Sequence, residues 1–212
     1  MLTLHHLVTS RSSRVIWLLE ALGLKYELVT HQRGPDYRAL PDLAEAHPLG
    51  KAPTLRDGDL VLFESAAILR HVATRYGNGR FTPPPGTDAF SIHDQWLDFA
   101  EGSFMMPMMI KLLGRAAADG LPPALEHFAT PEYHKFAAYL GNCVSSGGFL
   151  LGATPMLADI QMSYCLAVAE AEAGGLLQDH PKLQAYWQHL QAEPGYKRMI
   201  EIGGPLIMNF SR

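Results

Sequence analysis

Glu64 and Ser65 form a polar pair at the point where a predicted strand changes into a predicted helix. Apolar residues occupy positions 60–63 before the pair, and side chains at helical spacing follow it from Ala67 to Val72. A serine in the first turn of a helix can bond to free backbone N–H groups. The N-terminus of a helix can also hold an anion, because these N–H groups and the helix dipole carry partial positive charge. The pair therefore predicts a helix cap or an anion-binding site.

The segment just before this pair predicts a tight hairpin. Residues 54–56 and 60–63 are two short strand-like runs, and Asp57-Gly58 between them supplies the positive φ values that a type I′ turn requires. Pro53 precedes the first run. A loop, a hairpin and the start of a helix are thus packed into the nineteen residues 47–65.

Hydroxyl side chains are concentrated in a second place, between a predicted first strand and a predicted first helix. Residues 2–8 form a half-buried strand pattern, and the sequence Thr-Ser-Arg-Ser-Ser follows at residues 9–13. Apolar residues at positions 15, 18, 19 and 22 define one helical face, which Gly23 can terminate. Taken alone, a serine in this turn is expected to cap the helix.

The two segments together resemble one protein family. The sequence LGKAP at residues 49–53, followed by the Asp-Gly-Asp hairpin and by Phe63-Glu64-Ser65, resembles the glutathione-binding core of cytosolic glutathione transferases. The sequence SRSSRVIWLLEALGL at residues 10–24 resembles the N-terminal motif of the serine-type members, in particular a bacterial and fungal branch. The resemblance covers nearly the whole chain and is weaker in the second half.

The resemblance implies a binding site for the tripeptide glutathione. Pro53 would be cis, so that the backbone of Ala52 faces the cysteinyl unit, and Lys51 would also hold the peptide. Glu64 and Ser65 would bind the γ-glutamyl carboxylate and amino group. An extended peptide can pair with exposed backbone as an added strand, which agrees with this arrangement. Glutathione would be a co-substrate, and no permanently bound cofactor is expected.

The resemblance also implies a hydroxyl group that activates the glutathione thiol. Some serine-type classes place this group at the position of Ser10 and others at that of Thr9; the pattern SRS-x-R favours Ser10, and Thr9 remains the alternative. Lowering a thiol pKa from its ordinary value of about 8.5 by about 2 units requires about 2.7 kcal/mol of preferential thiolate stabilisation. The turn contains no cysteine or tyrosine, so a disulfide-exchange mechanism is disfavoured.

The expected electrophile pocket lies in the second half of the chain. Residues 104–109 contain four methionines, and the family presents this stretch to the sulfur of glutathione. We therefore assign Met105 and Met106 to the pocket, with Tyr164 as a further candidate. The alternative is that these methionines fill the core, which is the commoner role of methionine on a helix.

Composition and charge exclude several other functions. The chain has 212 residues, of which 48% are hydrophobic, and a net charge of −4 with interspersed signs, so neither a nucleic-acid stripe nor a membrane-surface patch is present. No apolar run is long enough to span a bilayer, and no signal peptide is recognisable. The two cysteines lack metal-ligand spacing, and His5 and His6 of one strand point to opposite faces, so no metal site is expected. A cytoplasmic location fits these features.

The predicted fold class is α+β. Residues 1–79 would form a thioredoxin-like domain with a four-stranded mixed sheet, residues 80–87 a proline-rich linker, and residues 88–212 an all-helical domain that lines the electrophile site. Within the second domain a long helix is predicted over residues 88–114, which Pro107 should kink or break. Asp159 should bond back to the cap of the family's central buried helix, although Met156 occupies the usual Ser/Thr cap position.

Two functions follow from the resemblance. The first is a homodimeric glutathione transferase that conjugates the thiolate to hydrophobic electrophiles, with a glutathione-dependent peroxidase side activity. The second is a non-catalytic module that binds glutathione or a protein partner. The sequence does not identify the electrophile, because apolar pockets have no residue code.

Overall fold

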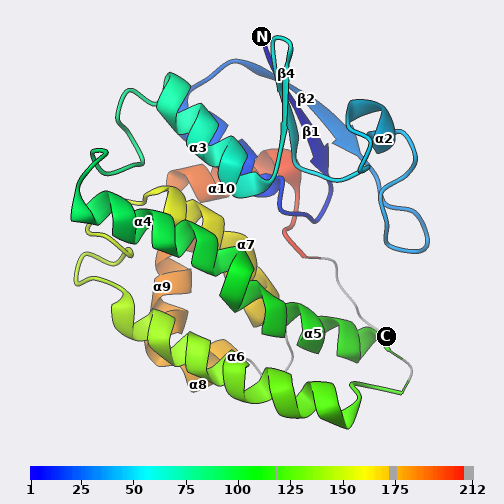
Figure 1. The fold of residues 1–212 in the computed structure, drawn as a ribbon, viewed down its shortest axis with the longest axis vertical. Coiled ribbons are helices and arrows are strands. Elements are labelled where there is room, and N and C mark those ends of the chain that lie inside the picture. Colours follow the sequence, from blue (N-terminus) through cyan, green and yellow to red (C-terminus); the bar gives the residue numbers. More distant parts are fainter. Residues whose placement is uncertain (118, 172–175, 208–212) are drawn as a thin grey trace. The chain divides into compact units, whose positions relative to one another are not determined.

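The computed structural model describes residues 1–117, 119–171 and 176–207 (Figure 1). They divide into two compact units, one of residues 1–81 with 193–207 and the other of residues 82–192. The sequence analysis assigned residues 193–207 to the helical domain, whereas here they join the first unit through α10 (Pro194–Gly203), which packs on α1 (Ser13–Leu22). A Cβ at Gly195 would lie 2.3 Å from Trp17 Nε1, so glycine permits this close approach.

The first unit is built on a four-stranded mixed sheet with the strand order β2-β1-β3-β4. The central strand β1 pairs in parallel with β2 and antiparallel with β3, and β3 pairs antiparallel with β4. This sheet and the helical second unit confirm the predicted α+β class. The strands are β1 (Leu2–Leu7), β2 (Tyr26–His31), β3 (Thr54–Asp57) and β4 (Leu60–Phe63).

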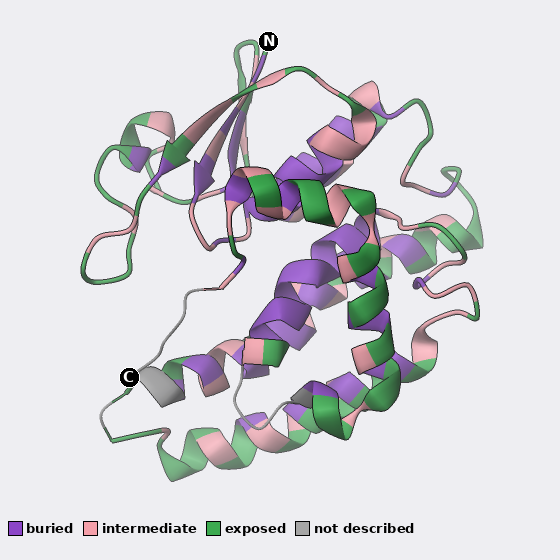
Figure 2. Ribbon diagram, turned by 180° about the vertical axis from the view of Figure 1, so that it is seen from behind, coloured by how far each residue is buried: buried purple, intermediate pink, exposed green. Residues whose placement is uncertain are grey.

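Helix α1 lies in the core of the first unit. Seven consecutive residues from Ser13 to Leu19 are buried (Figure 2), and the helix ends where Gly23 adopts the left-handed conformation with φ of 68°. Both the helix and its glycine terminator confirm the prediction. The other helices of this unit are α2 (Leu43–Ala46), α3 (Ser65–Tyr76) and α10.

The hairpin is present, but its predicted turn type is wrong. Asp57 pairs with Leu60, so Gly58 and Asp59 are the two central residues of the turn. Gly58 has φ of 62°, whereas Asp59 does not have a positive φ. A positive φ at the first central residue alone is the mark of a type II′ turn, which also matches the twist of paired strands.

In the second unit, the predicted long helix is interrupted. Helix α4 (Asp88–Phe99) is followed by a π-helical turn at Ala100–Phe104, and α5 (Met105–Ala116) continues from there. Pro107 cannot donate a hydrogen bond to the carbonyl of Ser103, and its ring would clash with that carbonyl in a regular helix. The wider π turn directly before Pro107 relieves this conflict, so the helix changes its winding ahead of the proline and continues through it in α5, in place of the expected kink or break at Pro107.

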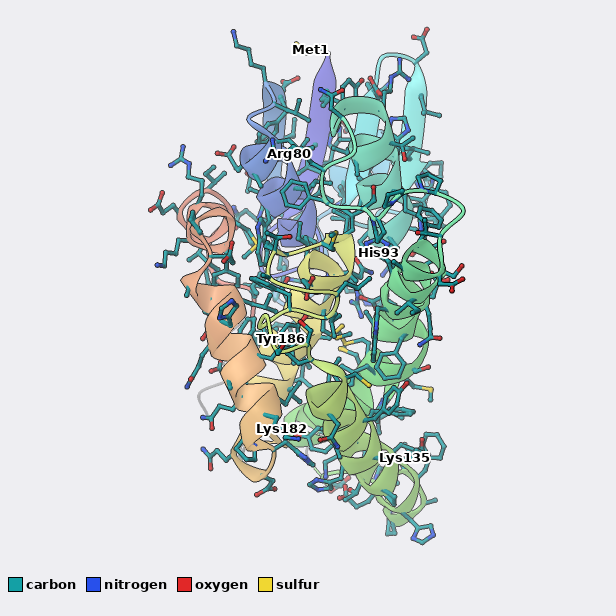
Figure 3. The ribbon with its side chains drawn as sticks, turned by 90° about the vertical axis from the view of Figure 1, so that its left-hand side faces the viewer. Met1, Arg80, His93, Lys135, Lys182 and Tyr186 are labelled. Carbon is teal, nitrogen blue, oxygen red and sulfur yellow. The ribbon has the colours of Figure 1, made fainter. Side chains whose placement is uncertain are left out.

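Helix α7 (Leu157–Ala171) is the buried centre of the second unit, and every residue from Leu157 to Ala169 is buried. Asp159 accepts a hydrogen bond from the backbone N–H of Met156 at 2.8 Å, which confirms the predicted return to the cap. Tyr186 of α9 (Pro181–Ala192), labelled in Figure 3, donates to the same carboxylate at 2.7 Å. Burial raises the pKa of Asp159, although these hydrogen bonds oppose the rise. The remaining helices are α6 (Pro123–Cys143) and α8 (Leu176–Asp179).

Two features that would bear on function are absent from the described residues. No helix in this part of the chain combines the length and the hydrophobicity that crossing a membrane requires. The same residues contain no group of three or more His, Cys, Asp or Glu side chains placed to hold a metal ion.

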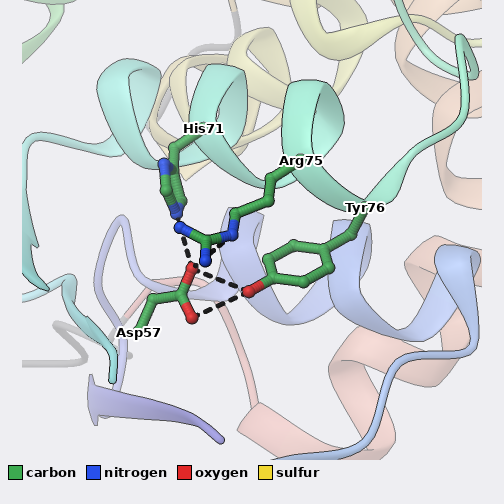
Figure 4. A network of polar contacts seen from close by, with 4 residues as sticks. All are labelled: Asp57, His71, Arg75 and Tyr76. Atoms are coloured by element: carbon green, nitrogen blue, oxygen red, sulfur yellow. Dashed lines mark hydrogen bonds and ion pairs between the residues drawn. The ribbon is translucent and has the colours of Figure 1, made fainter. Parts of the chain in front are cut away.

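A buried carboxylate fastens the hairpin to α3. Asp57 accepts hydrogen bonds from His71 Nε2 at 2.9 Å and from the Tyr76 hydroxyl at 2.7 Å, and Arg75 Nε lies 3.5 Å from the same carboxylate (Figure 4). Burial raises the pKa of Asp57, but the bonds from His71 and Tyr76 and the charge of Arg75 together hold that pKa below its usual value. The hairpin and the helix that follows it are thereby held in one orientation.

We expect Asp57→Asn to lower the free energy of unfolding by about 1–3 kcal/mol at pH 7, because it weakens two bonds to a buried charge. A folded-state pKa below the unfolded value of about 3.9 contributes stability above pH 4, which is lost as the pH falls through the folded value. The difference between wild type and variant should therefore shrink in urea unfolding at about pH 3. The exposed turn variant Asp59→Asn is the control. Equal losses in both variants, or a difference that grows at acid pH, would contradict this role.

Candidate functional site

The turn between β1 and α1 holds Ser10 inside the protein. The side chain of Ser10 is 6% exposed, and its Oγ lies 2.6 Å from Ser12 Oγ and accepts a bond from the Ser12 backbone N–H at 3.2 Å. Ser12 Oγ in turn lies 2.8 Å from His6 Nδ1. The preferred candidate hydroxyl is therefore the outer member of a buried polar chain.

Thr9, the alternative candidate, has different partners. Its hydroxyl donates to the carbonyl of Val8 at 2.7 Å and accepts from Arg33 Nε at 3.0 Å. Arg33 also donates to the Thr9 carbonyl at 2.9 Å, and Thr9 has a positive φ of 53°. A positive φ is unusual for a β-branched residue, and the guanidinium group accounts for how this conformation is held. The Thr9 hydroxyl is thus fixed against backbone, whereas the Ser10 hydroxyl leads into the core.

The loop before the hairpin has the predicted backbone form. The Ala52–Pro53 peptide bond is cis, as expected. The hydroxyl of Thr54, which is buried, donates to the carbonyl of Lys51 at 2.9 Å and so joins the two sides of this bend. Pro53 is buried, Ala52 is partly exposed and Lys51 is exposed. Ala52 therefore keeps part of its surface in solvent, whereas the proline that follows it is buried.

The junction of β4 and α3 has an unusual backbone conformation at Glu64. This residue has φ of 70° and ψ of 116° and its side chain is exposed. Within the described part of the chain, the Glu64 side chain makes no capping bond to α3. Positive φ at a residue other than glycine costs of order 1–3 kcal/mol and is concentrated at ligand sites. Ser65 is buried as the first residue of α3, so the pair stands at a helix N-terminus as predicted.

Arg14 links the two parts of the site. Its side chain is fully buried, and Nη1 donates to Ser65 Oγ at 3.1 Å. The start of α1 and the start of α3 are therefore connected by a buried cation, which also adds positive charge beneath the N-terminus of α3. The sequence analysis missed this role. One feature of the sequence could have indicated it. Arg14 stands three residues before Trp17 and four before Leu18, so a charged side chain lies next to apolar ones on the same face of the helix.

His6 and Ser12 are also partners that the sequence analysis missed. His6 Nε2 lies 3.0 Å from the carbonyl oxygen of Gly203 in α10, 197 residues away in the chain. Periodicity and turn residues report on neighbouring positions and cannot predict a contact between residues 197 positions apart. His5 and His6 have different hydrogen-bond partners, which agrees with the opposite orientations predicted for them. His5 Nδ1 lies 3.1 Å from His31 Nε2.

The residues predicted to hold the electrophile belong to the second unit and differ in exposure. Met105 and Tyr164 are only 2% and 7% exposed, whereas Met106 is 46% exposed. Burial of Met105 agrees with the alternative role of core filling, and Met106 is available at the surface. Their assignment to an electrophile pocket stays a prediction.

Comparisons with known proteins agree with this arrangement. Residues 1–74 match the family model of the glutathione S-transferase N-terminal domain, and residues 122–201 match that of the glutathione S-transferase C-terminal domain. Glutathione S-transferase 1 of Saccharomyces cerevisiae is 28% identical to this chain over an alignment that covers 97% of each protein.

Two solved structures extend the likeness. The crystal structure of a glutathione S-transferase from Actinobacillus pleuropneumoniae is 32% identical, has a TM-score of 0.86, and covers 97% of this chain and 94% of its own. A glutathione transferase from Phanerochaete chrysosporium, solved with oxidized glutathione, shares the fold with a TM-score of 0.78 at 23% identity, over 94% of this chain and 93% of its own. The chain therefore belongs to the glutathione S-transferase family.

Proposed function

We propose that this protein is a glutathione transferase in which Ser10 activates the thiol of bound glutathione. The observation that carries the proposal is the N-terminus of α3, where an exposed Glu64 in a rare backbone conformation precedes the buried Ser65. Arg14 connects that helix start to the turn that contains Ser10. A site of this kind suits a ligand with a carboxylate at one end and an ionisable thiol at the other.

Glutathione is held along the backbone between the two helix starts. Glu64 binds its amino group, and the helix N-terminus with Ser65 binds its γ-glutamyl carboxylate. Lys51, Ala52 and Pro53 hold the cysteinyl part, with the Ala52 backbone pairing to the peptide as an added strand would. The exposure of Lys51 and the partial exposure of Ala52 support this role.

The chemistry of the site is stabilisation of the thiolate, which is the nucleophile. Ser10 donates a hydrogen bond to the sulfur and is not itself a covalent nucleophile. A charge-assisted bond of this kind and the N-terminal end of α1 can together supply the required free energy. Thr9 remains the alternative donor. The Thr9 hydroxyl donates to a backbone carbonyl, that of Val8, whereas the Ser10 hydroxyl lies beside a second hydroxyl, that of Ser12, with which it can exchange a proton, and this difference supports the assignment to Ser10.

The electrophile is the second substrate, and hydrophobic compounds are the proposed class. Met105, Met106 and Tyr164 are the residues proposed to receive it, since thioether and aromatic groups adapt to varied apolar shapes. The same thiolate can attack the O–O bond of an organic hydroperoxide, so a peroxidase side activity belongs to the proposal. A cytoplasmic location, where glutathione is reduced, completes it.

Removing each hydroxyl in a separate variant distinguishes Ser10 from Thr9 as the donor to the thiolate. Ser10→Ala should remove a charge-assisted bond worth about 1.5–3 kcal/mol, so that turnover of a generic aryl halide at pH 7 falls about tenfold or more. Retention on immobilised glutathione should change little, and a higher pH should restore part of the rate. The matched variant Thr9→Val should keep most of the activity.

Three results would count against this assignment. A defect in Thr9→Val with none in Ser10→Ala moves the donor to Thr9. Normal turnover in both variants removes any hydroxyl from the mechanism. Retention of the wild type on immobilised glutathione without turnover of any electrophile favours the alternative, a non-catalytic module that binds glutathione or a protein partner.

A homodimer is the proposed assembly, with the first domain of each chain meeting the second domain of the other. Light scattering at micromolar concentration should then give twice the chain mass of 23.4 kDa. A particle of a single chain mass under those conditions would contradict the dimer.

A further inference from the structure

A continuous chain of buried polar groups runs from Ser10 to the backbone of Gly203, the last residue of α10. Ser10 Oγ lies 2.6 Å from Ser12 Oγ, Ser12 Oγ lies 2.8 Å from His6 Nδ1, and His6 Nε2 lies 3.0 Å from the carbonyl oxygen of Gly203. All three side chains are buried, and those of Ser12 and His6 are completely so. A titratable group therefore stands two hydrogen bonds behind the hydroxyl assigned to the thiol.

The geometry at Gly203 fixes the tautomer of His6. A carbonyl oxygen only accepts, so His6 Nε2 must carry a proton. Burial lowers the pKa of His6, with the nearby His31 adding to the decrease and the bond to Gly203 opposing it, so the imidazole is neutral near pH 7. A neutral ring protonated at Nε2 has a lone pair at Nδ1. His6 Nδ1 therefore accepts a hydrogen bond, and Ser12 is its donor.

This tautomer also sets the direction of the two hydroxyl protons. Ser12 gives its single proton to His6 Nδ1 at 2.8 Å in preference to the Leu7 carbonyl at 3.3 Å. The proton of Ser12 is then not available for the 2.6 Å contact between the two serine hydroxyls, so Ser10 must be the donor in that hydrogen bond. In the resting protein, the Ser10 hydroxyl consequently donates inward to Ser12. It cannot donate to a sulfur atom at the same time, because a hydroxyl has one proton.

We propose that His6 is the acceptor of the glutathione thiol proton, through Ser10 and Ser12. The S–H bond breaks and its proton passes to Ser10 Oγ, the proton of Ser10 passes to Ser12 Oγ, and the proton of Ser12 passes to His6 Nδ1. Each hydroxyl loses one proton and gains one, so the net products are a thiolate and an imidazolium. The inference rests on the proposed function and explains how Ser10 becomes a donor to the sulfur only after the thiol ionises.

Burial lowers the pKa of His6 and so opposes a charge on the ring, whereas the bond to the Gly203 carbonyl raises that pKa and favours the imidazolium. Gly203 brings the backbone of α10 close to the ring, since a Cβ there would lie 3.3 Å from His6 Cε1 and 2.8 Å from Ile16 Cδ1. Of the segments around the ring in the described structure, the turn before α1 offers Ser12, α10 the Gly203 carbonyl, and β2 the titratable His31. A charge on His31 would oppose the imidazolium, and the new thiolate favours it. The two opposite charges form together, so the net charge of the complex is unchanged.

A count of released protons tests the relay. Glutathione is added to the protein in weakly buffered solution with a pH indicator, thiolate is measured by its ultraviolet absorbance, and S-methylglutathione provides the blank for protons from other groups. We expect wild type to release far less than one proton for each thiolate formed. His6→Gln keeps an N–H donor for Gly203 but cannot accept the proton, so it should release about one proton for each thiolate. His5→Gln, the same substitution on the opposite face of β1, should behave as wild type.

Each other outcome overturns a defined part of the account. Release of about one proton per thiolate by wild type rejects His6 as acceptor and leaves the transferase assignment intact. Absence of binding or of thiolate in wild type rejects the proposed function and the relay with it. If His6→Gln does not fold, nitrogen NMR of wild type labelled at histidine decides the matter: His6 should change to the imidazolium form with glutathione and not with S-methylglutathione. An unchanged neutral ring would overturn the relay.

Discussion

The hydroxyl group of Ser12 is the point on which the first unit depends. One buried oxygen lies within hydrogen-bonding distance of His6 Nδ1, Ser10 Oγ and the backbone N–H of Leu7. It joins the end of β1 to the start of α1 and, through His6, to α10. An unpaired buried polar group costs about 1–3 kcal/mol, so these partners hold one another in place. The position of Ser10, and hence any role for it in chemistry, follows from this arrangement.

A second buried link extends the arrangement to α3. Arg14, the second residue of α1, donates a hydrogen bond to Ser65, the first residue of α3. The N-terminal ends of the two helices are therefore connected within one unit. Both ends favour negative charge. The hydrogen bonds of His71 and Tyr76 to Asp57 connect the C-terminal half of α3 to the hairpin that precedes this helix. Together these contacts hold the start of α3, where Glu64 has its unusual backbone conformation, in a fixed place relative to the start of α1 and the hairpin.

Local rules predicted the parts of the site that neighbouring residues determine. The hairpin, the end of α1 at Gly23 and the start of α3 at Ser65 follow from turn residues and periodicity. The turn type was wrong because the strand register, which is not a local property, decides which two residues are central. The contact of His6 with Gly203 and the placement of α10 were missed because they join residues nearly the whole chain apart. Periodicity likewise could not distinguish the buried Met105 from the exposed Met106.

The central claim is that glutathione lies along the first unit with its sulfur at Ser10, and a crystal structure of the complex tests it most directly. The account predicts the γ-glutamyl carboxylate at the N-terminus of α3 beside Ser65, the cysteinyl backbone paired with Ala52, and the sulfur within hydrogen-bonding distance of Ser10 Oγ. A sulfur atom that contacts Thr9 Oγ1 instead, or a peptide bound away from Glu64 and Ser65, would contradict it.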